Sequence, residues 1–140
     1  MALFTNTDAG NWPEVKAVLA DKVLLDFSSM SGSPAIELSS LQIIDAWKGL
    51  LPGFDKTDHQ ITAIRIHQDG NRAEATYHGN ADHYLGNKTW TVEADYETEL
   101  IQQGDTWLIT RHKLNLISQT GDLNLPAEAA EAVKQKIAKQ

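Results

Sequence analysis

Two stretches of strict alternation constrain this chain more than any other feature. In residues 72–85, small or apolar side chains fill most odd positions and polar ones fill most even positions. Residues 89–100 alternate in the same way, with the apolar and aromatic side chains at even positions. A period of two is that of a β-strand with one buried face. With a further strand expected over residues 106–117, after a glycine-containing turn, the pattern predicts an antiparallel sheet solvated on one face.

Helices are expected on the other face. Asn11, followed by Pro13 and Glu14, marks one helix start, and a terminal helix is expected to begin near Asn124. A short apolar run at residues 23–27 indicates a strand between the first two helices.

The clearest helix signal is a capping box formed by Ser39 and Gln42. The helix behind it is expected to stop at Pro52 and to bury one stripe. The stripe consists of Leu41, Ile44, Trp47 and Leu51.

The order of elements predicts an α+β fold in which helices cover the concave face of a strongly bent antiparallel or mixed sheet. We expect residues 1–140 to form one domain. Such a bent sheet leaves a conical cavity suited to a small molecule. Ala73, Ala75, Gly79 and Ala81 on the inward face of residues 72–85 leave room there.

Composition excludes several classes of function. The net charge of −7 argues against nucleic acid or an anionic membrane as partner. The chain has no cysteine, so disulfides and thiolate chemistry are ruled out. No apolar run approaches the ~20 residues of a membrane span, and the first residues do not resemble a signal peptide, so we expect a cytoplasmic protein.

The five histidines are the natural candidates for acid–base chemistry. His83 has inward parity, where a catalytic histidine and a core histidine bonded to a backbone carbonyl are about equally plausible. His59, at the start of the preceding strand, is by itself most simply a surface residue. His67 and His78 are expected to face solvent, and His112 is ambiguous.

No spacing of histidines and acids predicts a metal site, and no glycine-rich loop or nucleophilic serine motif is present. We therefore expect no metal and no cofactor. The aromatic residues Tyr96, Phe27, Trp47 and Tyr77 are expected to contact substrate, although core packing is the simpler reading for the tryptophans.

Five segments spread over most of the chain carry a resemblance to a known family, namely residues 8–12, 23–27, 57–61, 81–83 and 104–107. They resemble SnoaL-like domains of the nuclear transport factor two-like superfamily, and among these scytalone dehydratase. The resemblance implies a cone-shaped α+β barrel and a catalytic set of Asp8, His59 and His83. Against the family pattern, the N-terminal helix before Asp8 is expected to be unusually short.

Three pocket positions depart from scytalone dehydratase. Two tyrosines of that enzyme correspond here to Thr7 and Phe27, and an asparagine corresponds to Tyr96. The resemblance therefore supports acid–base chemistry more strongly than it supports the same polyketide substrate.

These observations favour a cofactor-independent lyase or isomerase, dehydratase-like, acting on a cyclic or polyketide-like carbonyl or hydroxyl compound. We expect His83 to be the base, oriented by Asp8, His59 to donate the proton, and Tyr96 to bind an oxyanion.

Other functions stay open. A non-catalytic domain for ligand binding or assembly is the main alternative. A steroid-isomerase-like carboxylate base is less favoured, because the acids of the sheet have outward parity. The resemblance also implies a homo-oligomer, a dimer or trimer.

Overall fold

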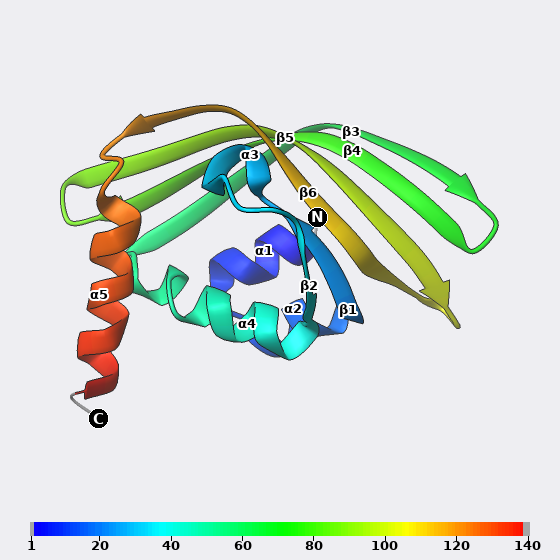
Figure 1. Cartoon of the computed structure of the whole chain (residues 1–140), viewed down its shortest axis with the longest axis horizontal. Helices are drawn as coiled ribbons and strands as arrows, with labels where there is room; N and C mark the ends of the chain where they lie inside the picture. Colours follow the sequence, from blue (N-terminus) through cyan, green and yellow to red (C-terminus); the bar gives the residue numbers. More distant parts are fainter. Residues whose placement is uncertain (1, 139–140) are drawn as a thin grey trace.

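The alternating segments form two neighbouring long strands of a six-stranded sheet, seen in a computed structural model that describes residues 2–138 (Figure 1). The strands are β1 (Leu19–Asp26), β2 (Ile36–Ser39), β3 (Lys56–Asp69), β4 (Arg72–Leu85), β5 (Lys88–Gln103) and β6 (Thr106–Gly121). The helices are α1 (Ala2–Ala9), α2 (Trp12–Ala17), α3 (Ser28–Ser31), α4 (Ser40–Lys48), the 3₁₀ turn η1 (Leu51–Gly53) and α5 (Leu125–Ala138).

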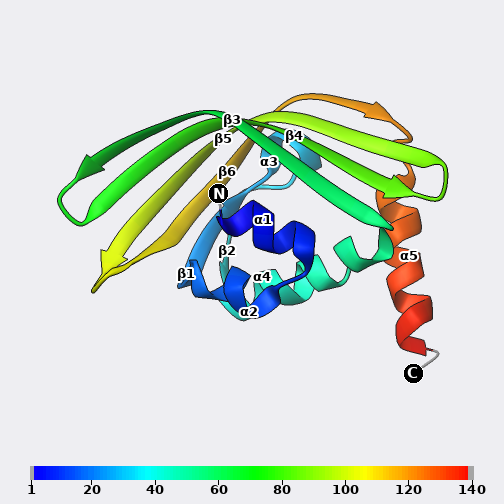
Figure 2. The same ribbon diagram turned by 180° about the vertical axis from the view of Figure 1, so that it is seen from behind.

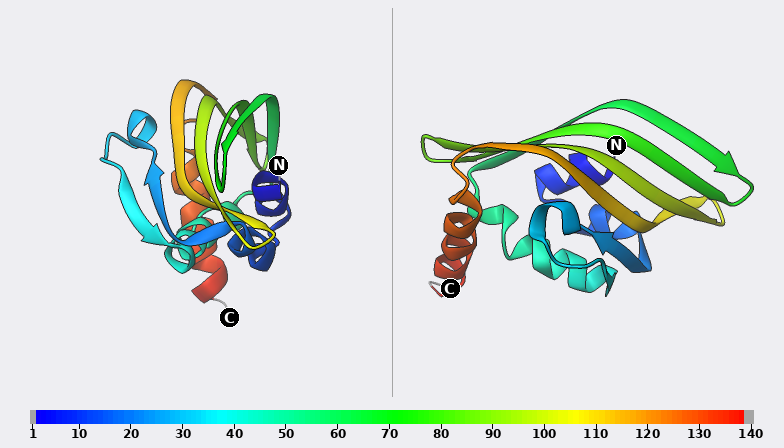
Figure 3. Two further views of the ribbon diagram at one scale, coloured as in Figure 1. Left: turned by 90° about the vertical axis from the view of Figure 1, so that its right-hand side faces the viewer. Right: turned by 45° about the horizontal axis from the view of Figure 1, so that its top comes forward.

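The strand order is β2-β1-β6-β5-β4-β3. Strands β3 to β6 form an antiparallel meander, whereas β1 runs parallel to β6, so the sheet is mixed. The sheet curls strongly over the helices but does not close (Figure 3). The predicted α+β fold of a bent sheet with helices on its concave face is confirmed.

Bulges bend the long strands. The register of β3 against β4 shifts between Thr62 and Arg65, where Ala63 has a φ of 55°. Two further shifts interrupt the pairing of β5 with β6. Because a bulge adds a residue to one strand only, it increases local twist and curvature. The inward face of β3 therefore ends at Ile61, and Ala63 is exposed.

Helix α4 lies below the sheet with α1 and α2, while α5 packs at one end (Figure 2). The predicted capping box of α4 is present. The Ser39 side chain accepts a hydrogen bond from the Gln42 backbone N–H, and the Gln42 side chain accepts one from the Ser39 backbone N–H. The expected stripe is partly wrong, because Leu41 is 58% exposed and Ile43 is fully buried. The helix packs against β1 and β2, which turns Ile43 and Ile44 inward.

The core has two parts. The larger lies between the sheet and helices α1, α2 and α4, and includes Val15, Val23 and Ile43. The smaller lies under α5, where Leu125 and Ala129 pack against the inward side chains of β4 and β5. No helix among residues 2–138 is both long and apolar enough to span a membrane.

Candidate active site

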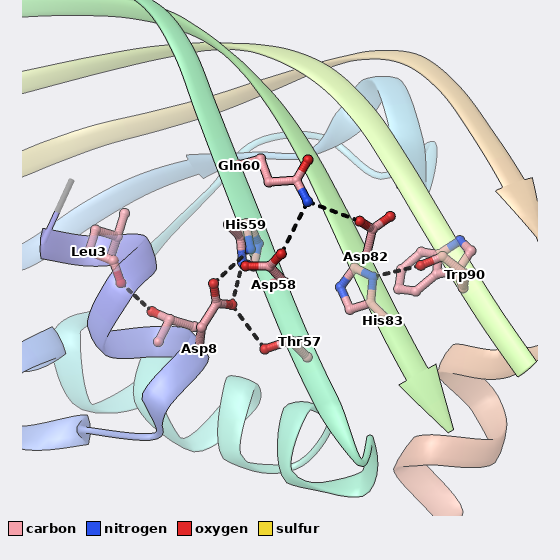
Figure 4. Close-up of polar contacts among 10 residues, drawn as sticks. Leu3, Asp8, Thr57, Asp58, His59, Gln60, Asp82, His83 and Trp90 are labelled. Carbon is pink, nitrogen blue, oxygen red and sulfur yellow. Dashed lines mark hydrogen bonds and ion pairs between the residues drawn. The ribbon is translucent and has the colours of Figure 1, made fainter. Parts of the chain in front are cut away.

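The predicted parities bring two of the three proposed catalytic residues to neighbouring strands. His59 of β3 is opposite Ala81, and His83 of β4 is opposite Thr57, so the two histidines are diagonal neighbours on the inward face. Their ring centroids are 6.1 Å apart. Asp8 lies beside His59, in the last turn of α1 and against the start of β3 (Figure 4).

Asp8 contacts His59, not His83. Its Oδ1 lies 2.6 Å from Nδ1 of His59, and its Oδ2 accepts a 2.7 Å hydrogen bond from the His59 backbone N–H. The Thr57 hydroxyl donates to Oδ1 at 2.9 Å. The sequence-based expectation that Asp8 orients His83 is therefore wrong. Helix α1 ends beside residues 57–59, so the carboxylate meets the nearer histidine.

This arrangement keeps Asp8 ionised. Burial by itself raises the pKa of the Asp8 carboxyl, but the hydrogen bonds and charge of His59, together with the Thr57 hydroxyl, outweigh it and leave the pKa below its usual value. An ionised carboxylate only accepts hydrogen bonds, so Nδ1 of His59 carries a proton and donates it. The nitrogen of His59 that remains for a ligand is Nε2.

His83 has a different environment. Its Nδ1 lies 3.0 Å from the Trp90 carbonyl, which only accepts, so Nδ1 is protonated here too. The ring packs between Trp90 and Phe54, and the side chain is 5% exposed. Burial, helped by the charge of His59, lowers the pKa of His83 to about 4. His83 is therefore neutral near pH 7 and presents the lone pair of Nε2.

Both histidines line one cavity of about 130 Å³ between the sheet and the helices. Its other polar groups are Thr7, Tyr96 and His112, and most of its wall is apolar. The remaining lining residues are Leu3, Phe4, Phe27, Met30, Trp47, Leu50, Leu51, Ala81, Trp90, Val92 and Leu114. An engineered cavity of roughly 150 Å³ holds one benzene ring, so this volume suits a small monocyclic compound.

Three of the four aromatic residues expected to contact substrate line this cavity, namely Phe27, Trp47 and Tyr96. Tyr77 does not. Its ring stacks behind Tyr96, with centroids 5.2 Å apart, and its hydroxyl bonds to Thr98. Burial raises the pKa of Tyr96 to about 12, so its hydroxyl stays protonated and can donate a hydrogen bond.

Sequence reasoning left two important wall residues unassigned. Phe4 of α1 lies against His59, with ring centroids 4.9 Å apart, and also contacts Tyr96. His112 is 3% exposed and stacks on Tyr96. The inward parity shared by His112 and Leu114 was the available signal, whereas nothing in residues 2–9 marked Phe4 as a pocket residue.

A metal ion has no evident site here. Within residues 2–138, no group of three or more histidine and acidic side chains is placed to hold one. The arrangement supplies instead an ion-paired imidazole, a neutral imidazole and a tyrosine hydroxyl around an apolar volume.

Comparison with known proteins identifies the family of this chain. The family model for the SnoaL-like domain matches residues 2–113, which is most of the chain. The protein belongs to the SnoaL-like domain family. A search of curated protein sequences found no match.

Solved structures share the fold of this SnoaL-like protein. The Kfla4162 protein from Kribbella flavida is 23% identical, with a TM-score of 0.79 over 94% of this chain and 88% of its own. A candidate scytalone dehydratase from Novosphingobium aromaticivorans is 12% identical, with a TM-score of 0.70 over 86% and 80%. Hexachlorocyclohexane dehydrochlorinase LinA-type3 from Novosphingobium barchaimii is also 12% identical, with a TM-score of 0.68 over 87% and 84%. These likenesses, all below 25% identity, show a shared fold.

Proposed function

We propose that this SnoaL-like protein is a cofactor-independent lyase or isomerase that removes a proton from carbon in a small cyclic carbonyl compound. The observation that carries the proposal is the Asp8–His59 pair at the wall of an apolar cavity. A histidine held by a carboxylate through Nδ1–H has Nε2 directed to substrate, and the carboxylate stabilises the imidazolium that forms.

The geometry favours His59 over His83 as the base. Asp8 stabilises a positive charge on His59 directly, whereas burial lowers the pKa of His83 to about 4 and disfavours its protonation. His83 is better suited to accept a hydrogen bond from a substrate hydroxyl at Nε2. This assignment moves the role of base from His83 to His59, which also keeps the role of proton donor that the sequence suggested for it.

The proposed elimination uses one mobile proton. Nε2 of His59 takes a proton from the carbon next to the substrate carbonyl, and the electron pair moves onto the carbonyl oxygen, where Tyr96 donates a hydrogen bond. The enolate then expels the β-hydroxyl, which takes the proton from His59 and leaves as water. In an isomerisation, the same proton returns to a different carbon.

The test uses 3-hydroxycyclohexanone as elimination substrate and cyclohexanone as a probe of proton exchange in D₂O. We expect NMR to show cyclohexenone from the first and deuterium at the α-carbons of the second. Asp8→Asn and His59→Gln should each lower both rates by roughly 10²-fold or more, the contribution typical of acid–base catalysis. His67→Gln, at an exposed position of β3, is the matched control and should retain the full rates.

Wild-type rates no higher than those of Asp8→Asn would contradict the proposed chemistry for this substrate class. If both compounds bind in the cavity under those conditions, the alternative of a non-catalytic ligand-binding domain is favoured.

We also propose that the protein forms a homo-oligomer, a dimer or trimer. Strand β3 is at the edge of the sheet, and its Ile64 and Ile66 are 48% and 69% exposed. An edge strand with exposed apolar side chains is prone to association. Light scattering should give a mass above that of one 15.5 kDa chain, and Ile66→Lys should lower it. A monomeric wild-type protein would contradict this proposal.

A further inference from the structure

A buried chain of three polar groups ends at the cavity and has no part in the proton transfer described above. Tyr77, Thr98 and His112 lie on β4, β5 and β6 and are 3%, 0% and 3% exposed. The Tyr77 hydroxyl lies 2.6 Å from Thr98 Oγ1, which lies 3.0 Å from Nδ1 of His112. The Tyr77 hydroxyl and Nδ1 are 3.5 Å apart.

The number of hydroxyl protons decides which nitrogen of His112 is protonated. Among the described residues, the two hydroxyls have hydrogen-bond partners only within this group. One proton can lie between the Tyr77 and Thr98 oxygens, so the other must be donated to Nδ1 of His112. If Nδ1 carried a proton of its own, one buried hydroxyl would have no acceptor, which folded proteins avoid. Nδ1 therefore accepts, and the ring proton is on Nε2.

Nε2 of His112 opens to the cavity. Every enclosed side-chain nitrogen or oxygen in the described part of the chain has a hydrogen-bond partner. Nε2 of His112 has no such partner there, so packing does not enclose it, and its ring lines the cavity. Burial also lowers the pKa of His112 to about 4, which agrees with a neutral ring.

The cavity therefore has a donor side and an acceptor side. On β3 and β4, His59 and His83 use Nδ1–H for protein partners and offer Nε2 to a ligand. On β5 and β6, Tyr96 offers O–H and His112 offers Nε2–H, with their rings stacked and their centroids 5.4 Å apart. Two donors side by side match one oxygen that becomes negative during reaction.

We propose that His112 donates a hydrogen bond from Nε2–H to the substrate carbonyl oxygen, beside Tyr96, and that Thr98 and Tyr77 are positioning residues that fix its tautomer. The inference rests on the proposed function for the direction in which charge develops. It also defines the substrate as a small ring whose carbonyl oxygen points to β6 and whose acidic carbon points to His59.

The tautomer is tested directly by long-range ¹H–¹⁵N NMR of the histidine side chains in the wild-type protein. We expect the Nε2–H form for His112 and the Nδ1–H form for His83. In the double variant Y77F/T98V, which removes both hydroxyls, His112 should shift towards Nδ1–H. Thr98→Ser keeps the hydroxyl and should keep the wild-type form. An Nδ1–H form of His112 in the wild-type protein would overturn the inference.

Measurements of ligand affinity separate the contribution of the His112 hydrogen bond from that of packing. We expect His112→Phe to bind cyclohexanone about threefold to tenfold more weakly, the effect of one neutral hydrogen bond, and to bind toluene unchanged. An equal loss of affinity for cyclohexanone and toluene would show that His112 contributes packing alone, and it would refute the proposal.

Failure of this inference and failure of the proposed function give different results. The tautomer of His112 and the affinity for cyclohexanone can both be measured without turnover. Asp8→Asn should remove proton exchange of cyclohexanone and leave the hydroxyls of Tyr77 and Thr98 in place. Normal catalysis with Nδ1–H at His112 would overturn only the present inference.

Discussion

Apolar side chains occur both in the half of the sheet that the helices cover and at its free end, but their surroundings differ. In β4, inward side chains from Ala75 to His83 are buried because helices and the 3₁₀ turn lie below them. In β3, residues 62–69 are exposed on both faces, although Ile64 and Ile66 are among them. Figure 1 shows the two long hairpins extending beyond the helices at this end. Alternation thus indicates which side chains share a face, but not whether anything covers that face.

The covered half also contains the proposed active site. A larger groove of about 470 Å³ lies at the free end, lined by residues such as His67, Arg72 and Glu99. It is open and charged, and it contains none of the three cavity histidines. The smaller cavity is the better candidate site, because its apolar wall strengthens the few polar contacts that it contains.

The largest contrast is expected from glycine substitution. A Cβ at Gly53 would lie 1.9 Å from the backbone oxygen of Ala129, so η1 and α5 must separate in Gly53→Ala. We expect a loss of about 4 kcal/mol in unfolding free energy, measured by urea denaturation. Gly70→Ala at the free end meets nothing within 4 Å and is strained only by its φ of +61°, so it should cost about 1 kcal/mol. Similar losses would show that α5 is not part of the stable core.

Acid should destabilise the covered half through its histidines. Burial lowers the pKa of His83 and of His112 from 6.5 to about 4, so between these values the unfolded chain binds more protons than the folded one. Stability is then fully present above pH 6.5 and falls as the pH drops to 4, by roughly 3 kcal/mol per histidine.

Urea denaturation at several pH values measures this slope. His112→Gln should flatten it, and His67→Gln at the exposed free end should not. An unchanged slope in His112→Gln would show that this histidine is protonated in the folded protein.

Gly79→Ala should move Tyr96. The added Cβ would lie 2.8 Å from the Tyr96 ring and 3.1 Å from Ile61, within the inward face of β4. We expect a loss of about 1–3 kcal/mol and a changed Tyr96 ring signal by NMR, because the ring must shift towards the cavity. An unaltered Tyr96 signal would mean that the backbone of β4 shifts instead of the Tyr96 ring.

The smallest effect is expected from one substitution, isoleucine to valine, made once in the covered half and once at the free end. Ile43→Val removes a methylene group from a fully buried side chain of α4 and should cost about 1 kcal/mol. Ile66→Val, at a side chain 69% exposed, should change stability by less than about 0.5 kcal/mol. Thermal unfolding of both variants provides the measurement, and equal shifts would show that the free end is covered in solution.

Local rules predicted much of the fold. The bounds of β4 and the capping box of α4 agree with the structure, because each depends on neighbouring residues only. The same rules misplaced Leu41 and missed Phe4, because the burial of a helix face depends on which elements pack against it. The resemblance to SnoaL-like domains correctly supplied the family and the helix containing Asp8, which periodicity did not reveal.

By itself, the sequence determined that a one-sided sheet places His83 on its inward face, since a period of two fixes that parity, whereas His59 by itself was most simply a surface residue. Only the tertiary structure decided that Asp8 contacts His59 and that the Trp90 carbonyl holds His83. It also decided that Nδ1 of His112 faces the hydroxyls of Thr98 and Tyr77, one of which donates a hydrogen bond to it. These contacts join residues from different elements, and strand bulges and helix placement set them. They decide where each histidine carries its proton, which parity cannot encode.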